Sequence, residues 1–316
     1  MNKNISYFLL LALFTTACNS KIKDSNVQID VEDGTQVEDN SSVEKLNESR
    51  QIVNNSQETN VLGFWVGYFE EDTKEHFNEK GVFVDEGFYW NRANKINISI
   101  DAITDNEVIG HSVVAGNNRP FKGTLKDGIF HVKEPGTDKY DGEFKFQLVD
   151  NKLEGKWTAY KNIDIKKRKY SLEKMNFVYN PDVMLEKERS YVDWNKFIKE
   201  DISIEDEEFV DWVRKEFASA TDLIYTINAS NTRLQKKDVE NLKKGDLTII
   251  RNTIYARHGY SFKNRPLRVF FDAQSWYIPI HTDIKSEFTE LEKENIKILL
   301  RYEKNAKEYY DYFGRG

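Results

Sequence analysis

Short runs of alternating apolar and polar residues fill the sequence between residues 61 and 178, and this pattern constrains the fold most strongly. The run NKINISIDAI (residues 94–103) has the two-residue period of a half-buried strand. Similar runs follow at a spacing of roughly 10 to 13 residues. They are separated by the turn signals Asp105-Asn106, Asn117-Asn118, Asp127-Gly128 and Asp150-Asn151. Short strands at this spacing predict an antiparallel β-barrel or β-sandwich over residues 61–178.

The first run, GFWVGYFE (residues 63–70), resembles the Gly-x-Trp opening of lipocalin-like barrels, and this favours a barrel over a sandwich. A small barrel either fills its interior with side chains or holds one apolar ligand. We expect the large side chains mainly to fill the core. Those available for either use are Phe64, Trp65, Phe69, Phe88, Tyr89, Trp90, Phe144, Phe146 and Trp157.

After residue 178 the apolar residues return at helical spacing. We predict a helical connector over residues 179–229, with helices near 184–199 and 207–218, and a helical domain over residues 230–316. The last helix, predicted over 289–313, opens with a capping box formed by Thr289 and Glu292. Asn295 lies on the apolar face of that helix, where it needs a buried partner. The chain is therefore expected to be an α+β protein, in which a lipocalin-like antiparallel meander precedes an all-helical C-terminal domain.

Residues 1–17 have the features of an export signal: Lys3, an apolar run of about 10 residues, and small residues directly before Cys18. The apolar run is too short to cross a bilayer as a helix. The segment resembles a bacterial lipoprotein signal, although Thr15 stands where that family usually has a leucine-like residue. The resemblance implies that Cys18 is lipidated; a plain secretory signal is the alternative. Because Cys18 is the only cysteine, no internal disulfide can form.

Charge is distributed unevenly along the chain. Residues 19–60 contain nine acidic and four basic residues and no aromatic one, so they cannot bury enough apolar surface to fold. We predict that residues 18–60, from the lipidated cysteine onward, are a disordered acidic tether. The whole chain has a net charge of −7, which argues against nucleic acid as a partner, whereas residues 231–316 have a net charge of +5.

The most concentrated motif is IIRNTIYARHGYSFKNRPLRVFF (residues 249–271). Apolar residues at helical spacing precede Gly259, which is expected to end the helix because glycine adopts the left-handed C′ conformation without a Cβ clash. His258 is then the C-cap residue, and Arg257 lies in the last turn, where a cation suits the negative end of the helix dipole. Pro266 is expected in the first turn of the next helix.

This motif, together with FDAQSWYIP and FTELEKENIKILLRYE further on, resembles the YARHG domain of exported bacterial proteins over about residues 230–305. The resemblance implies an extracellular location. It implies no activity, because the family is defined by sequence alone. The residues that carry it are Arg251, Asn252, Tyr255, Ala256, Arg257, His258, Gly259, Phe262, Phe270 or Phe271, Trp276, Tyr277, Leu291, Glu292 and Asn295.

The sequence shows no motif for catalysis or for metal binding. The histidines form no i, i+4 pair, and a Gly-x-Ser-x-Gly motif, a glycine-rich phosphate loop and a cysteine besides Cys18 are all absent. We therefore predict no catalytic residue, no metal and no cofactor. A hydrolase with paired carboxylates stays a remote alternative, because a sequence does not show which carboxylates lie close together.

Between residues 247 and 271, five basic residues and no acidic one are interleaved with aromatic residues. Guanidinium groups bind carboxylates or phosphates, and aromatic faces stack on sugars or peptides. We predict a contact surface for an anionic envelope glycan (peptidoglycan or lipopolysaccharide) or for an envelope protein. Its predicted residues are Tyr255, Arg257, His258, Lys263, Arg265, Trp276 and Tyr277, while Arg251, Asn252, Gly259 and Asn295 are assigned structural roles.

The alternative is that the motif belongs to the interior, with Arg251 and Arg257 bonded to helix-end carbonyls, to Asn295 or to acidic groups such as Glu292. Either way, the sequence favours a non-catalytic lipoprotein of the bacterial cell envelope, with a binding or scaffolding role. We expect a lipid anchor to hold this protein at the outer membrane. A carrier or sensor whose barrel holds a small apolar molecule is the alternative function.

Overall fold

The computed structural model describes residues 61–72, 83–84, 88–89, 92–202 and 212–311. The predicted signal over residues 1–17, Cys18 and the acidic tether over residues 18–60 lie outside the described residues, and so does Trp90. No helix in the described ranges combines the length and the apolar character that crossing a membrane requires.

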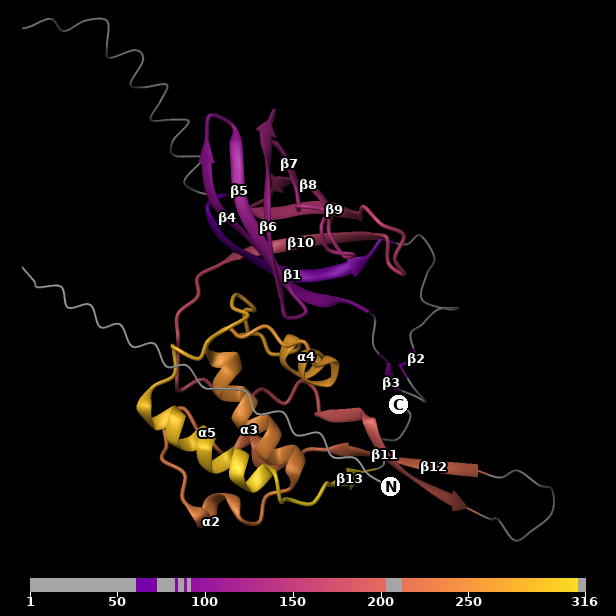
Figure 1. Cartoon of the computed structure of the whole chain (residues 1–316), viewed down its shortest axis with the longest axis vertical. Coiled ribbons are helices and arrows are strands. Elements are labelled where there is room, and N and C mark those ends of the chain that lie inside the picture. Colours follow the sequence, from indigo (N-terminus) through magenta and orange to yellow (C-terminus); the bar gives the residue numbers. More distant parts are fainter. Residues whose placement is uncertain (1–60, 73–82, 85–87, 90–91, 203–211, 312–316) are drawn as a thin grey trace, which may run out of the picture. The chain divides into compact units, whose positions relative to one another are not determined.

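The N-terminal part is a closed antiparallel barrel, which confirms the barrel expectation (Figure 1). Its strands pair in the order β1-β10-β9-β8-β7-β6-β5-β4, so sequence neighbours pair from β4 to β10 and β1 closes the ring. Two short strands, β2 (Phe83–Val84) and β3 (Phe88–Tyr89), pair separately. The barrel strands are β1 (Gly63–Glu71), β4 (Asn94–Thr104), β5 (Glu107–Val114), β6 (Asn117–Lys126), β7 (Ile129–Lys133), β8 (Gly142–Val149), β9 (Lys152–Ala159) and β10 (Lys167–Met175).

Tight turns close one end of the barrel at three of the predicted positions. Both residues of Asp105-Asn106, Asp127-Gly128 and Asp150-Asn151 have positive φ, as two-residue hairpin turns require. The fourth prediction is displaced, because the residues with positive φ are Ala115 and Gly116, and Asn117 already begins β6. The side chain of Asn117 donates to the carbonyl of Ala115 instead.

Inward-facing side chains fill most of the barrel, as expected from the alternating runs. Trp65 is anchored by a 2.7 Å hydrogen bond from its indole nitrogen to the carbonyl of Val61. Phe130 and Phe146 stack with ring centroids 4.7 Å apart. Full burial of one such side chain contributes roughly 1.5–3 kcal/mol, so these contacts account for much of the stability of the barrel.

Strand β4 is buried on both faces from Asn94 to Ile100, because the C-terminal domain packs against the outside of the barrel there. Ile96 and Ile98 point into the barrel core, while Lys95 on the other face is also buried. Lys95 Nζ donates to the carbonyls of Gln274 (2.7 Å) and Tyr277 (3.0 Å). The barrel and the helical domain are therefore joined by a buried interface.

The C-terminal domain is helical, as expected. It contains η1 (Asp222–Tyr225), α2 (Lys236–Val239), α3 (Lys244–Arg257), α4 (Arg265–Asp272) and α5 (Glu290–Glu303). Helices α3 and α5 pack side by side around a core that includes Ile250, Phe271 and Leu299 (Figure 1). The predicted capping box is present at the start of α5, where Thr289 and Glu292 cap each other.

The prediction of a helical connector over residues 179–229 is wrong. The segment contains β11 (Val192–Ile202) and β12 (Trp212–Ser219), which pair as an antiparallel hairpin. The register shifts between Asp193 and Phe197, and such an irregularity displaces apolar residues from the two-residue period. The last predicted helix is also too long: it ends at Glu303, and β13 (Tyr310–Asp311) instead adds a third strand beside β12.

Candidate ligand-binding site

Helix α3 ends as the sequence predicts. His258 is the C-cap residue, and Gly259 follows with φ of 70°. The N–H of Tyr260 donates to the carbonyl of Tyr255 (3.1 Å) and that of Gly259 to Ala256 (2.9 Å), the paired bonds of a Schellman motif. The rings of Tyr255 and Tyr260 pack edge to face with centroids 6.0 Å apart, which is the expected hydrophobic contact.

The two charged residues of this helix end face the interior. Arg257 is 3% exposed and donates from Nε (3.0 Å) and Nη2 (2.7 Å) to the carbonyl of Val183, and from Nη1 (3.1 Å) to Ser230 Oγ. Burial lowers the pKa of Arg257 to about 10, so the guanidinium stays charged at neutral pH. Its donors are used within the protein.

His258 is 6% exposed and lies 2.8 Å, from Nε2 to Oε2, from the fully buried Glu292. Tyr179 stacks on the imidazole ring at 4.3 Å and donates its hydroxyl to Glu292 Oε1 (2.9 Å). Burial opposes ionisation of Glu292, but hydrogen bonds from His258 and from the Thr289 backbone outweigh it and hold the pKa of the carboxyl below its ordinary value. These groups form an interior network.

The four residues assigned structural roles are placed in the same domain core or at its edge. Asn295 donates to the carbonyls of Ala229 and Thr232, both at 2.8 Å, and accepts from the N–H of Leu234. Arg251 pairs with an acidic group, Glu303 (2.8 Å), as the interior alternative predicts, and Asn252 donates to the carbonyl of Thr248. At Gly259, an added Cβ would lie 2.6 Å from Ile280.

The seven residues of the predicted contact surface do not form one exposed face. Arg257, His258 and Tyr277 are buried, and their polar atoms form hydrogen bonds with groups inside the protein. Lys263 is exposed, while Tyr255, Arg265 and Trp276 are half-buried. Within this set only Arg265 lines the cavity described next, so the structure separates residues that the sequence placed together.

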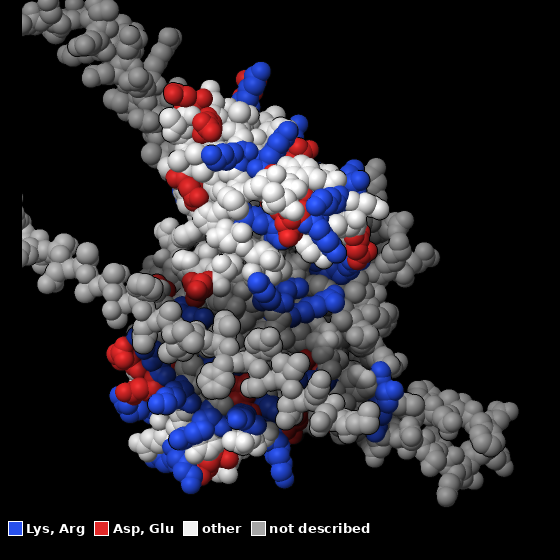
Figure 2. Space-filling model, in the orientation of Figure 1, with Lys and Arg blue, Asp and Glu red and all other residues white. Residues whose placement is uncertain are grey.

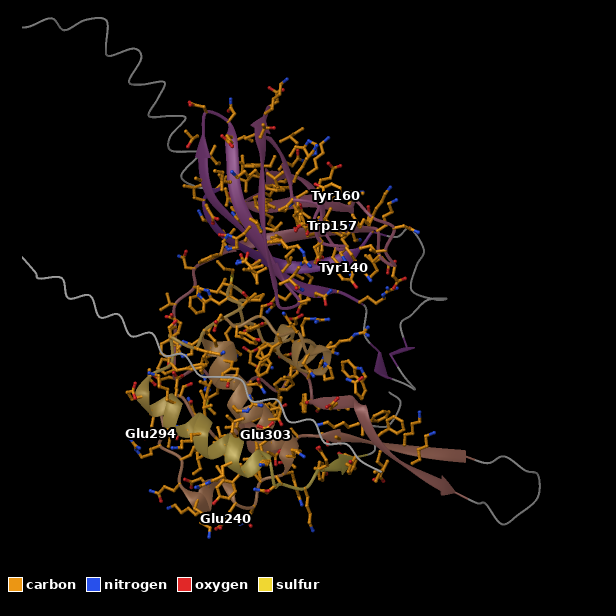
Figure 3. The ribbon with its side chains drawn as sticks, in the orientation of Figure 1. Tyr140, Trp157, Tyr160, Glu240, Glu294 and Glu303 are labelled. Carbon is orange, nitrogen blue, oxygen red and sulfur yellow. The ribbon has the colours of Figure 1, made fainter. Side chains whose placement is uncertain are left out.

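A cavity of about 410 Å³ opens at the barrel end opposite the three tight turns. Its apolar wall contains Phe69, Phe144 and Trp157, which are buried and also belong to the barrel core. Trp157 and Tyr140 lie in the same part of the barrel (Figure 3), and both line the cavity. Helix α4 reaches this mouth, where Arg268 Nε donates to Asn94 Oδ1 at 2.9 Å.

Arginines dominate the polar lining. Among the described residues, two lining side chains are acidic, Glu134 and Asp164, and five are arginines: Arg92, Arg119 and Arg168 from the barrel, and Arg265 and Arg268 from α4. Figure 2 shows how lysines and arginines are distributed over the surface that faces the viewer. Among the lining side chains, cationic groups therefore outnumber carboxylates, while Glu71, Asp138 and Asp141 pair with Arg92 and Arg119 from outside the lining.

Two of these arginines bond to neutral oxygens. Arg168 donates to the carbonyl of Phe69 (2.7 Å), and Arg268 donates to Asn94 and to the carbonyl of Lys263. In contrast, Arg92 bonds to Asp164. Burial lowers the pKa of Arg168 to about 10; the negative charges of Glu71 and Asp164 oppose this shift, and the positive charges of Arg92 and Arg268 add to it.

The pairing of Arg119 differs again, since it faces Asp138 and Asp141, each at 3.3 Å. Beside it, Glu134 accepts hydrogen bonds from the N–H of Gly142 (2.7 Å), from Ser112 Oγ (3.1 Å) and from the Trp157 indole (3.2 Å). Burial nevertheless raises the pKa of Glu134 to about 7. The charge of the cavity therefore changes near neutral pH.

The sequence analysis does not predict the barrel arginines as site residues, because each stands alone among ordinary surface charges. One signal was available for Arg168. It lies in register with Tyr170 and Leu172, which point into the barrel, so strand alternation directs it to the inner face. Arg119 carries the same signal, because it stands two residues before Phe121, which also points into the barrel, whereas Arg92 precedes β4 and carries none.

Comparison with known proteins adds one finding for the helical part. Residues 222–304 match the YARHG domain. This domain, found in extracytoplasmic proteins, contributes Arg265 and Arg268 to the cavity, while the barrel and residues 177–186 lie outside the match. No curated protein and no solved structure matches the chain.

Proposed function

We propose that this chain is a non-catalytic binding protein of the cell envelope, lipid-anchored through Cys18 at the outer membrane, whose barrel holds a small amphipathic anion. The observation that carries the proposal is the ring of arginines around a cavity with an aromatic wall. The YARHG match and the lipoprotein-like N-terminus support the location.

The lining has a distinct place for each half of such a ligand. Guanidinium groups recognise carboxylates and phosphates through charge-assisted, often bidentate hydrogen bonds. Phe69, Phe144 and Trp157 form the apolar end of the cavity, with at most 5% of each residue exposed, and the half-buried Ile163 adds apolar surface for a hydrocarbon tail. The volume of about 410 Å³ lies at the small end of the roughly 300–1,000 Å³ typical of ligand pockets. This suits a medium-length acyl chain; a polymeric glycan would enter only by an end group.

The contact between the two parts of the protein completes the site. Arg265 and Arg268 come from the YARHG domain, and the other arginines come from the barrel. A bound anion therefore bridges both, and it is expected to stabilise their packing as well as to occupy the barrel.

Isothermal titration calorimetry with decanoate, decyl phosphate, decanol and acetate tests the proposal on the full chain. Decanoate or decyl phosphate is expected to bind at least tenfold more tightly than decanol or acetate, because only they offer both a charge and a tail. Arg268→Gln is expected to weaken anion binding by roughly tenfold, the effect of one charge-assisted hydrogen bond. Arg301→Gln, an exposed substitution on α5, serves as the matched control.

The site is located by fluorescence. Decanoate should change the emission of the wild-type protein, and Trp157→Phe should remove most of that change while calorimetry still reports binding. Equal affinity for decanol and decanoate would favour a carrier of apolar molecules. No binding by any of these compounds would contradict a ligand site in the barrel.

A further inference from the structure

Residues 177–186, which follow the last barrel strand, lie along the YARHG domain with one face toward it. Tyr179 and Val183 are half-buried and Leu185 is buried, whereas Asn180 and Met184 between them are exposed. Leu185 belongs to the core cluster of the helical domain. The segment therefore behaves as a bound peptide with alternating contacts, although it forms no strand in the described structure.

The first anchor of this segment is aromatic. The Tyr179 ring stacks on His258, and its hydroxyl reaches the buried Glu292. The hydrogen bond between His258 and Glu292 holds both groups in place. An aromatic side chain with a terminal donor fits this position, because it supplies both a stacking face and a proton for the carboxylate.

The remaining anchors are directed at the main chain. Asn228 Nδ2 donates to the carbonyl of Pro181 (2.8 Å). Arg257 holds the carbonyl of Val183 with two N–H groups. Gln274, which is fully buried, accepts from the N–H of Glu186 (2.7 Å) and donates to its carbonyl (3.2 Å).

The side chains that hold the segment, Asn228, Arg257, His258, Gln274 and Glu292, all lie inside the matched residues 222–304, and the segment lies outside them. We infer that the YARHG domain is a peptide receptor, and that in this chain its peptide-binding surface is occupied by residues 177–186. The required partner has a tyrosine, followed by main-chain carbonyls two, four and seven residues later that meet Asn228, Arg257 and Gln274.

This recognition depends on few side chains of the peptide. Main-chain hydrogen bonds supply affinity, and the tyrosine position supplies selectivity, as in other modes of peptide recognition. Because residues 177–186 belong to the same chain, their effective concentration is high and they exclude a competing peptide. This surface accepts a peptide from solution once the contacts of the internal segment are weakened.

The test uses the full chain and a fluorescein-labelled peptide of residues 176–188, followed by fluorescence anisotropy. Tyr179→Ala/Leu185→Ala in the chain weakens the internal segment, so this variant is expected to bind the peptide at least tenfold more tightly than the wild type. Adding Arg257→Ala is expected to reduce that binding at least tenfold. A peptide carrying Tyr179→Ala should bind the Tyr179→Ala/Leu185→Ala chain as poorly as the unaltered peptide binds the chain that also carries Arg257→Ala. Adding the exposed control Arg301→Ala to the Tyr179→Ala/Leu185→Ala chain should have no effect on peptide binding.

A folded double variant that binds the peptide no better than the wild type would overturn the inference, as would binding that is indifferent to Arg257→Ala. If circular dichroism shows that the double variant does not fold, backbone amide hydrogen exchange is measured instead, in chains that carry a single substitution. Gln274→Ala is then expected to accelerate exchange at the Glu186 N–H at least tenfold, and Arg301→Ala to leave it unchanged. Equal Glu186 exchange in Gln274→Ala and the wild type would refute the main-chain clamp.

Discussion

Arg257 and Arg268 lie on successive helices of one domain, and burial lowers the pKa of both guanidinium groups. They differ in their surroundings. Arg257 donates hydrogen bonds to the carbonyl of Val183 and to Ser230 inside the helical core. Arg268 faces a cavity, beside other arginines. The comparison teaches that a basic residue is accessible to a ligand only where it borders open volume, however basic its neighbours in the sequence are.

This contrast predicts that substitutions at the helix end change stability, whereas substitutions at the barrel mouth change binding. The largest effect is expected for Glu292→Ala, which leaves buried His258 and the Tyr179 hydroxyl without their acceptor. Removing one partner of a buried pair costs about 3–5 kcal/mol of unfolding free energy. Urea unfolding measures it, and Glu294→Ala on the same helix is the control (Figure 3), since Glu294 forms an exposed ion pair with Arg233.

The next largest effect concerns the end of α3. Gly259→Ala must adopt positive φ, which costs about 1–2 kcal/mol, and its Cβ would also collide with Ile280. Gly128→Ala has the same backbone requirement, with φ of 76°, but its Cβ meets no described atom within 4 Å. Thermal unfolding should show a larger loss for Gly259→Ala. Equal losses would mean that the Ile280 contact relaxes freely.

The smallest effect concerns the barrel cavity, where the ionisation of Glu134 is expected to change ligand affinity. Because the pKa of Glu134 is about 7, raising the pH from 6 to 8 adds a negative charge to the cavity. Decanoate affinity is expected to fall by about threefold to tenfold over this range, since two like charges repel in a partly desolvated site. Glu134→Gln should bind with little dependence on pH, and calorimetry at several pH values checks this.

The same carboxyl should affect stability with a defined sign. Its folded pKa of about 7 exceeds its ordinary value of 4.5, so the folded state binds the proton more tightly. The stabilisation is present below about pH 4.5 and is lost as the pH rises through 7. Comparing unfolding of the wild type and Glu134→Gln across this window isolates the contribution; parallel curves would argue against a raised pKa.

Much of the architecture follows from local sequence signals. The alternating runs and the Asp-Asn, Asp-Gly and Asp-Asn turns identify the barrel, because a strand and a two-residue turn depend on neighbouring residues. Gly259 marks the end of α3 for the same reason. The sequence wrongly predicts a helical connector, because β11 carries a register shift near Asp193 and because β12 pairs with β13, far along the chain.

The candidate site depended on tertiary structure. The sequence by itself determined which residues are basic, where the helices end and that a YARHG-type domain follows a barrel. Only the fold decided that Arg257 meets Val183 and that Arg168 and Arg268 share a cavity. The physical reason is that the partners of a charged side chain depend on which distant segment packs over it, and long-range packing sets this. Turns, helix caps and strand periods are set by adjacent residues.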